Sequence, residues 1–153
     1  MREIKFRAWD TKTKKMIFTG FHVMGEVTCF GLIDQYIDEN HCGADTSLDR
    51  WNDIKLMQYT GLKDCKGKEI YEGDILELKA QGSGYAVLNW VAVVEFGNPN
   101  GEYNWGWQLK PIKGVGINPD ILLWVETEMP NVSCEIIGNI YETPELLRGE
   151  NGY

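Results

Sequence analysis

Short segments in which apolar and polar residues alternate constrain the fold of this chain more than any other feature. The first such segment places Ile4, Phe6 and Ala8 on one face, with Arg7 and Trp9 on the other. A period of two is expected where one face of a β-strand packs on a core and the other meets water. The polar residues that follow predict a turn, and the apolar residues after them predict a returning strand. We therefore expect the chain to begin with a β-hairpin.

Further strand candidates follow along the chain and are separated by turns. The β-branched run at 85–96 suits a central strand. Residues 61–71 predict a tight hairpin in which the Asp64 side chain caps the turn and Gly67 supplies a positive φ. Strands are predicted at 4–9, 16–19, 54–59, 75–79, 85–96, 105–109, 121–127 and 134–140. Together with 17 glycines, this spacing indicates a mainly β, small antiparallel sheet or partly open barrel, and not a parallel α/β fold.

Three segments depart from the strand pattern. Residues 23–33 predict an irregular strand, and residues 34–53 predict a loop or short helix of the kind that often carries function. Near the C-terminus, Thr143 is a favourable N-cap and Pro144 suits a first helical position, so a short helix is expected to follow.

The length of 153 residues fits one domain. We expect a single domain over residues 1–148, with a variable insertion at about 20–53. Residues 149–153 are expected to fray.

Composition excludes several classes of protein. The chain has 15 Lys and Arg against 23 Asp and Glu, a net charge of −8, which opposes electrostatically driven binding to duplex nucleic acid. The first residues lack the apolar core of a secretory signal, and no stretch has the ~18–20 apolar residues of a membrane span. Four irregularly spaced cysteines predict free thiols. We therefore expect a cytoplasmic protein without a membrane partner.

The charge is unevenly distributed. Residues 1–79 hold 12 basic and 14 acidic side chains (12 − 14 = −2), and residues 80–153 hold 3 and 9 (3 − 9 = −6). The first 15 residues reverse the sign, since Arg2, Lys5 and Arg7 belong to a basic run that could contact an acidic partner. The acidic half leaves open that the chain imitates nucleic acid to block a host enzyme.

Residues suited to catalysis or metal binding are few. His41 adjoins Cys42, but neighbours on extended chain point to opposite faces, so a thiolate–imidazole pair is poorly placed there. Cys42 as a nucleophile with His22 as its base remains an alternative. His22, Cys29, His41 and Cys42 match no common zinc spacing. We expect no enzyme activity, no metal and no cofactor.

Aromatic residues are abundant, at 12% of the chain. Exposed tryptophans could stack on the bases of single-stranded nucleic acid, but such platforms normally lie in positive grooves. An aromatic core or an interface between copies is the simpler interpretation. The candidate interaction surface consists of Arg2, Lys5, Arg7, Trp105, Trp107 and Trp124.

Four stretches resemble the YopX family of phage and prophage proteins: 1–10, 57–64, 67–75 and 137–147. The resemblance spans nearly the whole chain. It implies a mainly β fold with an SH3-like barrel element, a phage or prophage origin and no established activity. The residues that carry it are Tyr59, Gly61, Leu62, Asp64, Gly67, Ile70, Tyr71, Gly73, Asp74, Gly138, Asn139 and Tyr141.

Most of these residues have a structural interpretation. The glycines suit turns and close backbone approach, and Tyr59, Ile70 and Tyr71 suit a core. Asp64 and Asp74, with Glu72, are expected either to cap turns or to form an acidic cluster on one edge.

Three hypotheses for function follow. The leading one is a non-enzymatic, phage-encoded accessory module that binds proteins and self-associates as a homo-oligomer, with a host or phage protein as a further candidate partner. The alternatives are a small barrel that binds single-stranded nucleic acid and an acidic mimic of nucleic acid.

Overall fold

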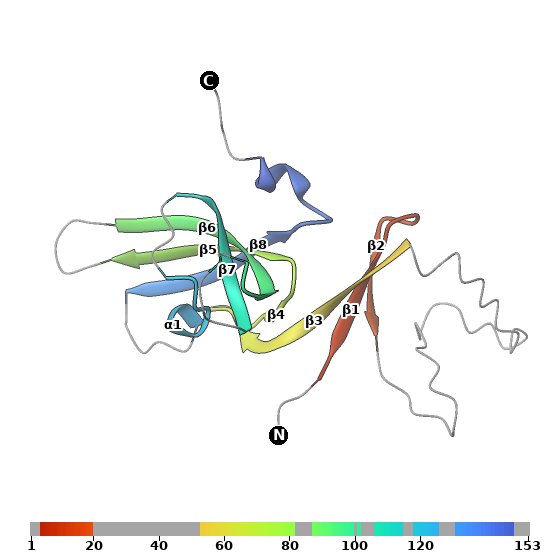
Figure 1. The fold of residues 1–153 in the computed structure, drawn as a ribbon, viewed down its shortest axis with the longest axis horizontal. Coiled ribbons are helices and arrows are strands. Elements are labelled where there is room, and N and C mark those ends of the chain that lie inside the picture. Colours follow the sequence, from red (N-terminus) through yellow and green to blue (C-terminus); the bar gives the residue numbers. More distant parts are fainter. Residues whose placement is uncertain are drawn as a thin grey trace, which may run out of the picture. The chain divides into compact units, whose positions relative to one another are not determined.

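The computed structural model describes residues 4–19, 53–81, 87–99, 101, 106–114, 118–125 and 131–148. The chain divides into two compact units, Met1–Tyr59 and Thr60–Tyr153, whose elements are labelled in Figure 1. The predicted irregular strand at 23–33, nearly all of the predicted loop at 34–53 and the predicted frayed tail lie outside the described residues. The single domain over 1–148 stays a prediction.

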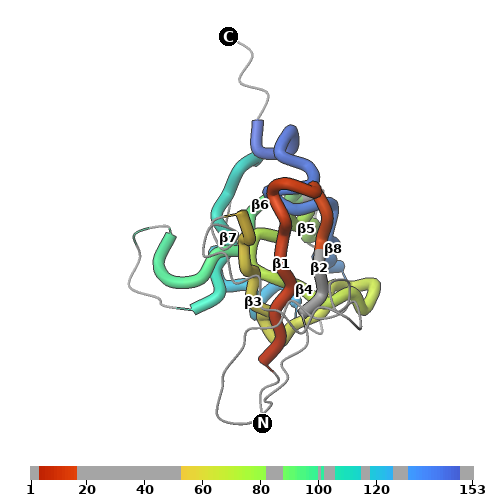
Figure 2. Tube along the Cα trace, turned by 90° about the vertical axis from the view of Figure 1, so that its right-hand side faces the viewer, coloured from red at the N-terminus to blue at the C-terminus, as the bar shows by residue number. Residues whose placement is uncertain are grey.

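The first unit is built on antiparallel pairing around β1 (Phe6–Asp10). β1 pairs with β2 (Lys15–Thr19) on one side and with the first half of β3 (Ile54–Lys63) on the other. Figure 2 shows the turn that joins β1 to β2. The predicted opening hairpin is therefore confirmed.

Burial along β1 differs from the predicted alternation. Arg7 and Trp9 are only 5% and 6% exposed, and Ala8 and Asp10 between and beside them are buried as well. Ile4, by contrast, is 63% exposed. The expectation that Arg7 and Trp9 meet water is wrong, because consecutive buried residues mean that both faces of this central strand are covered.

The second unit contains a sheet of four strands in the order β7-β6-β5-β8, curved into a half-barrel (Figure 1). Its strands are β5 (Asp74–Gln81), β6 (Val87–Gly97), β7 (Gly106–Lys113) and β8 (Val132–Asn139), and neighbouring strands run antiparallel. A further short strand, β4 (Glu69–Tyr71), follows β3. The mainly β, antiparallel fold class and the central position of the 85–96 run are confirmed.

One continuous apolar cluster forms the core of the second unit. It is built largely from the inward faces of β5 and β6, with single contributions from the other strands. Its buried members are Ile70, Leu76, Leu78, Trp90, Ala92, Val94, Leu109, Ile121, Trp124 and Cys134.

The strand predicted at 121–127 is wrong, because a helical turn, α1 (Leu122–Val125), occupies this region. The Asp120 carboxylate accepts a hydrogen bond from the Leu122 N–H at 3.0 Å and so caps the start of the turn. The turn directs Trp124 into the core, where its ring packs edge to face on the ring of Trp90, with the ring centroids 5.4 Å apart. Apolar periodicity does not distinguish so short a helix from a strand.

The short C-terminal helix is confirmed as a 3₁₀ turn, η2 (Pro144–Leu147), which begins with the proline. Thr143 does not cap it, contrary to the prediction. The Thr143 hydroxyl instead donates to the Asn139 carbonyl and accepts from the Asn139 N–H, both at 3.0 Å. Its hydrogen-bonding capacity is therefore committed to the end of β8.

A chain segment outside the sheet covers part of the edge strand β7. The Leu109 N–H donates to the Pro119 carbonyl at 2.8 Å, and Gln108 forms an antiparallel bridge with Asp120. Pro111, also in β7, has no N–H to offer. The two contacts satisfy backbone groups of β7, and Pro111 has no N–H donor. Fewer backbone groups of β7 are therefore left to pair with a further strand.

Candidate functional site

Two of the three basic residues of the predicted interaction surface, Lys5 and Arg7, make contacts within the first unit. Arg2 lies outside the described residues. The Lys5 ammonium lies over the Tyr59 ring, 5.4 Å from its centroid, in a cation–π contact. Arg7 is buried, and its guanidinium approaches the Met57 sulfur at 3.7 Å. Arg7 is therefore not available to a partner at the surface.

Three other lysines of the first unit are exposed at the turn between β1 and β2. We call Lys12, Lys14 and Lys15 the lysine tip. Lys12 forms an ion pair with Asp53 at 2.6 Å. Lys14 adopts a φ of 56°, and it is the one described residue other than glycine with a positive φ.

The Asp10 side chain stabilises the backbone of this turn. Asp10 is 2% exposed. One of its carboxylate oxygens accepts hydrogen bonds from the N–H groups of Lys12 and Thr13, at 2.8 and 3.1 Å. Its carbonyl accepts a third from the Lys14 N–H at 2.9 Å. The lysine tip is thus held in a defined backbone conformation.

The tryptophans of the predicted surface have different environments. Trp105 lies outside the described residues. Trp124 is 7% exposed, and its indole N–H donates to the Asn118 carbonyl at 3.1 Å. Trp124 is therefore a core residue, so it is not available for stacking on a nucleic-acid base.

Trp107 lies beside an aromatic residue that sequence reasoning missed. Phe96 on β6 is paired in register with Trp107 on β7, and their rings meet edge to face with centroids 4.9 Å apart. Trp107 packs partly against the core, whereas Phe96 is 60% exposed. We call these two residues the aromatic pair.

Strand parity explains why Phe96 was missed. It has the same parity on β6 as Trp90 and Val94, which are buried in the core, so alternation predicts an inward side chain. Phe96 lies next to the end of the strand at Gly97, beyond the reach of the core, and remains open to water. Its position as the last aromatic residue before a glycine-rich turn is the one sequence signal that could have drawn attention to it.

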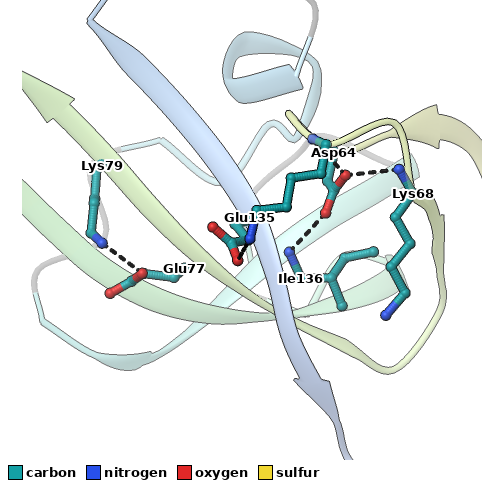
Figure 3. A network of polar contacts seen from close by, with 7 residues as sticks. Asp64, Lys68, Glu77, Lys79, Glu135 and Ile136 are labelled. Atoms are coloured by element: carbon teal, nitrogen blue, oxygen red, sulfur yellow. Dashed lines mark hydrogen bonds and ion pairs between the residues drawn. The ribbon is translucent and has the colours of Figure 1, made fainter.

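The hairpin turn between β3 and β4 contains a buried carboxylate, Asp64, shown in Figure 3. One oxygen of Asp64 accepts hydrogen bonds from the N–H groups of Lys66 and Lys68, at 2.9 and 2.8 Å. The other accepts from the Ile136 N–H on β8 at 3.2 Å. Turn capping by Asp64 is confirmed, as is the positive φ of Gly67, at 81°.

The same turn lies along the outer edge of β8. Besides the Asp64 contact, the Cys65 N–H donates to the Cys134 carbonyl at 2.9 Å. The Lys66 ammonium forms a hydrogen-bonded ion pair with the Glu135 carboxylate. The hydrogen bond and the negative charge of Glu135 raise the pKa of Lys66. The turn therefore occupies part of an edge that a partner strand could otherwise use.

The two described cysteines are free and differ in exposure. Cys65 is exposed and Cys134 is buried. Burial raises the pKa of the Cys134 thiol to about 12, with smaller contributions from the charges of Asp64 and Cys65. Cys134 therefore stays protonated and unreactive at neutral pH.

Three acidic residues lie in the turn before β5 and in the segment that follows β8, and the backbones of these two segments are in contact. The Ile140 N–H donates to the Gly73 carbonyl at 2.9 Å. Burial and the nearby charge of Glu72 raise the pKa of Tyr141. We call Glu72, Glu142 and Glu145 the acidic edge.

Asp74 is excluded from this cluster, although the predicted alternative included it with Asp64. Asp74 is 1% exposed and accepts a hydrogen bond from the Tyr71 N–H at 2.8 Å. The carboxylates of Asp64 and Asp74 therefore both accept hydrogen bonds from backbone N–H groups. Of the three predicted acids, Glu72 alone belongs to the acidic edge.

The described residues hold no group of three or more His, Cys, Asp and Glu side chains placed to bind a metal ion. The residues considered above as a nucleophile, its base or zinc ligands all lie outside the described residues. They are His22, Cys29, His41 and Cys42. Among the helices that the structure describes, none has the length and apolarity needed to cross a membrane.

Comparisons with known proteins bear on family and fold. A family model described as YopX protein matches residues 5–148. No curated protein matches the chain. A solved structure described as protein EF1440 from Enterococcus faecalis is similar to this chain at 25% identity and a TM-score of 0.50, over 96% of this chain and 99% of that one.

Proposed function

The chain belongs to the YopX family, and we propose that it is a non-enzymatic protein-binding module that associates with itself through the aromatic pair. In this proposal it is a phage or prophage accessory protein that acts in the host cytoplasm.

The observation that carries the proposal is the exposure of Phe96. At 60% exposed it presents a large aromatic side chain to water, held in place by its contact with Trp107. Aromatic side chains at protein interfaces contribute much of the binding energy, because they bury large area with few rotatable bonds.

The covered sheet edges support association through side chains and not through an added strand. Pro119 and Asp120 cover part of β7, and Asp64 and Cys65 cover part of β8. A second copy would therefore meet the aromatic pair rather than extend the sheet.

Light scattering of Phe96→Ser against wild type tests this function. Burying the exposed part of a Phe side chain contributes about 1–2 kcal/mol, so the substitution is expected to weaken association by about tenfold. Ile137→Ser is the matched control, because Ile137 is also an exposed apolar residue, at 36%, on the opposite edge strand β8. Association that is equally strong in Phe96→Ser, with Ile137→Ser weakened instead, would contradict the assignment.

A further inference from the structure

We propose that the lysine tip of one copy docks on the acidic edge of a second copy, so that the copies associate head to tail. This inference rests on the proposed self-association and adds its orientation. The charges select the surface of the second copy in this arrangement.

The conformation of the lysine tip is the first support. Positive φ favours Gly, Asn or Asp, yet position 14 is a lysine with φ 56°. A residue kept in an unfavourable backbone conformation points to a use for its side chain. Asp10 holds the surrounding turn through its buried carboxylate, so Lys14 and Lys15 are presented on an ordered backbone. Lys12 is already paired with Asp53, which leaves Lys14 and Lys15 as the principal cations.

The charge balance of the chain is the second support. The first unit as a whole is close to neutral, since residues 1–59 hold 8 basic and 9 acidic side chains (8 − 9 = −1). Its first 15 residues, which include the lysine tip, hold six basic side chains against the two acids Glu3 and Asp10 (6 − 2 = +4). The whole chain carries −8, so a second copy is itself an acidic protein. A locally basic tip on an acidic protein is complementary to another region of the same protein.

The acidic edge provides that region. Glu142 and Glu145 are exposed and Glu72 is half-buried. Within the described stretch 139–148, Arg148 is the one basic residue. The edge therefore presents more negative charge than its own neighbours neutralise.

A protein partner fits the tip better than a single-stranded nucleic acid does. Base stacking needs exposed aromatic rings beside the cations. Of the described aromatic residues of the first unit, Trp9, which precedes the tip, is 6% exposed and Tyr59 is 5% exposed. At physiological salt the Debye length is about 8 Å, so the tip responds to a compact acidic surface while more distant charges are screened.

A charge-swap experiment on the full chain tests the proposal. The tip variant is Lys14→Glu/Lys15→Glu, and the edge variant is Glu72→Lys/Glu145→Lys. The side-chain hydrogen bonds of the β1–β2 turn come from Asp10, so the tip variant keeps them, and η2 has no side-chain cap for the edge variant to remove. Each variant alone places like charges together and is expected to associate at least tenfold more weakly than wild type. An equimolar mixture restores association, because each reversed surface meets an oppositely charged one on the other variant. Lys63→Glu/Lys68→Glu, two exposed lysines of the second unit, is the charge-matched control and retains wild-type association.

The outcomes are distinguishable by sedimentation at about 50 mM salt, where charge effects are strong. A wild-type monomer would overturn the proposed function together with this inference. Wild-type association that neither swap weakens, or a mixture that fails to recover it, would overturn the inference alone. Quenching of tryptophan fluorescence by single-stranded DNA that the tip variant abolishes would assign the tip to nucleic acid and also overturn it.

Discussion

Asp64 and Ile136 are 72 positions apart in the chain, yet the Ile136 N–H donates a hydrogen bond to the Asp64 carboxylate at 3.2 Å. The other oxygen of that carboxylate accepts from two N–H groups of its own turn. One side chain therefore shapes the β3–β4 turn and also fastens it to β8. The family residue Asp64 has a structural explanation in this double role.

Replacing Asp64 with Ala is expected to lower the free energy of unfolding by about 2–4 kcal/mol. The substitution leaves three backbone donors without their acceptor, and hydrogen bonds to charged groups are among the stronger ones. Urea denaturation of the variant and wild type measures the difference.

Asp64→Asn separates the two roles of the carboxylate. An amide keeps one acceptor oxygen for the turn but presents an N–H₂ group where the other oxygen stood. We expect a loss between those of wild type and Asp64→Ala. If Asp64→Asn lowers the free energy of unfolding as much as Asp64→Ala does, the contact with β8 explains the entire effect. If Asp64→Asn lowers it by nothing, that contact does not contribute to stability.

Replacing Lys14 with Gly is expected to raise the free energy of unfolding by up to about 1 kcal/mol. Glycine adopts a φ of 56° without the steric cost that a lysine bears, and this gain exceeds the entropy that glycine adds to the unfolded chain. Thermal and urea denaturation measure it. Lys15→Gly, at a residue without a positive φ, is the control and should destabilise the protein.

Gly138→Ala tests the close approach of η2 to the end of β8. An added Cβ would collide with the Thr143 hydroxyl and lie 3.1 Å from Leu146 Cδ1. We expect a loss of about 1–3 kcal/mol in the free energy of unfolding. In the background of Thr143→Ala the collision is relieved, so the double variant should lose less than the sum of the two single ones. Strict additivity would contradict the proposed collision.

The buried Cys134 thiol predicts a pH dependence of stability. Its pKa is raised from 9.0 to about 12 in the folded protein. Below pH 9 the thiol is protonated in both states and contributes no pH dependence. Between these values the unfolded thiol loses its proton while the folded one keeps it, so stability falls as pH rises, with a slope approaching 1.4 kcal/mol per pH unit, to order of magnitude.

Cys134→Val isolates this contribution, because valine fills a similar volume and does not titrate. Urea denaturation at about pH 8 and about pH 10.5 is the measurement. Wild type should lose stability relative to the variant over this interval. A constant difference between the two proteins would mean that the thiol is not shielded from water.

The parts of the fold that the sequence predicted are those that neighbouring residues determine. The hairpin turn at Asp64 and Gly67 is local, and both residues act as expected. Burial of Arg7 and the contact of Asp64 with Ile136 depend on strands distant in the sequence, which no local pattern encodes.

The candidate site was harder to predict for the same reason. Trp124 and Phe96 are both aromatic residues in apolar stretches, yet one is in the core and the other is exposed. The difference arises because a capped helical turn directs Trp124 inward, while Phe96 lies where β6 ends. Tertiary position, and not residue type, decides which aromatic residue can meet a partner.

The most direct test of the central claim is sedimentation equilibrium of the wild-type protein over a series of concentrations. Self-association through Phe96 predicts an average mass that rises above the 17.5 kDa of the single chain with concentration, and a Phe96→Ser variant whose mass rises only at concentrations about tenfold higher. A wild-type mass that stays at 17.5 kDa at every concentration would contradict the account.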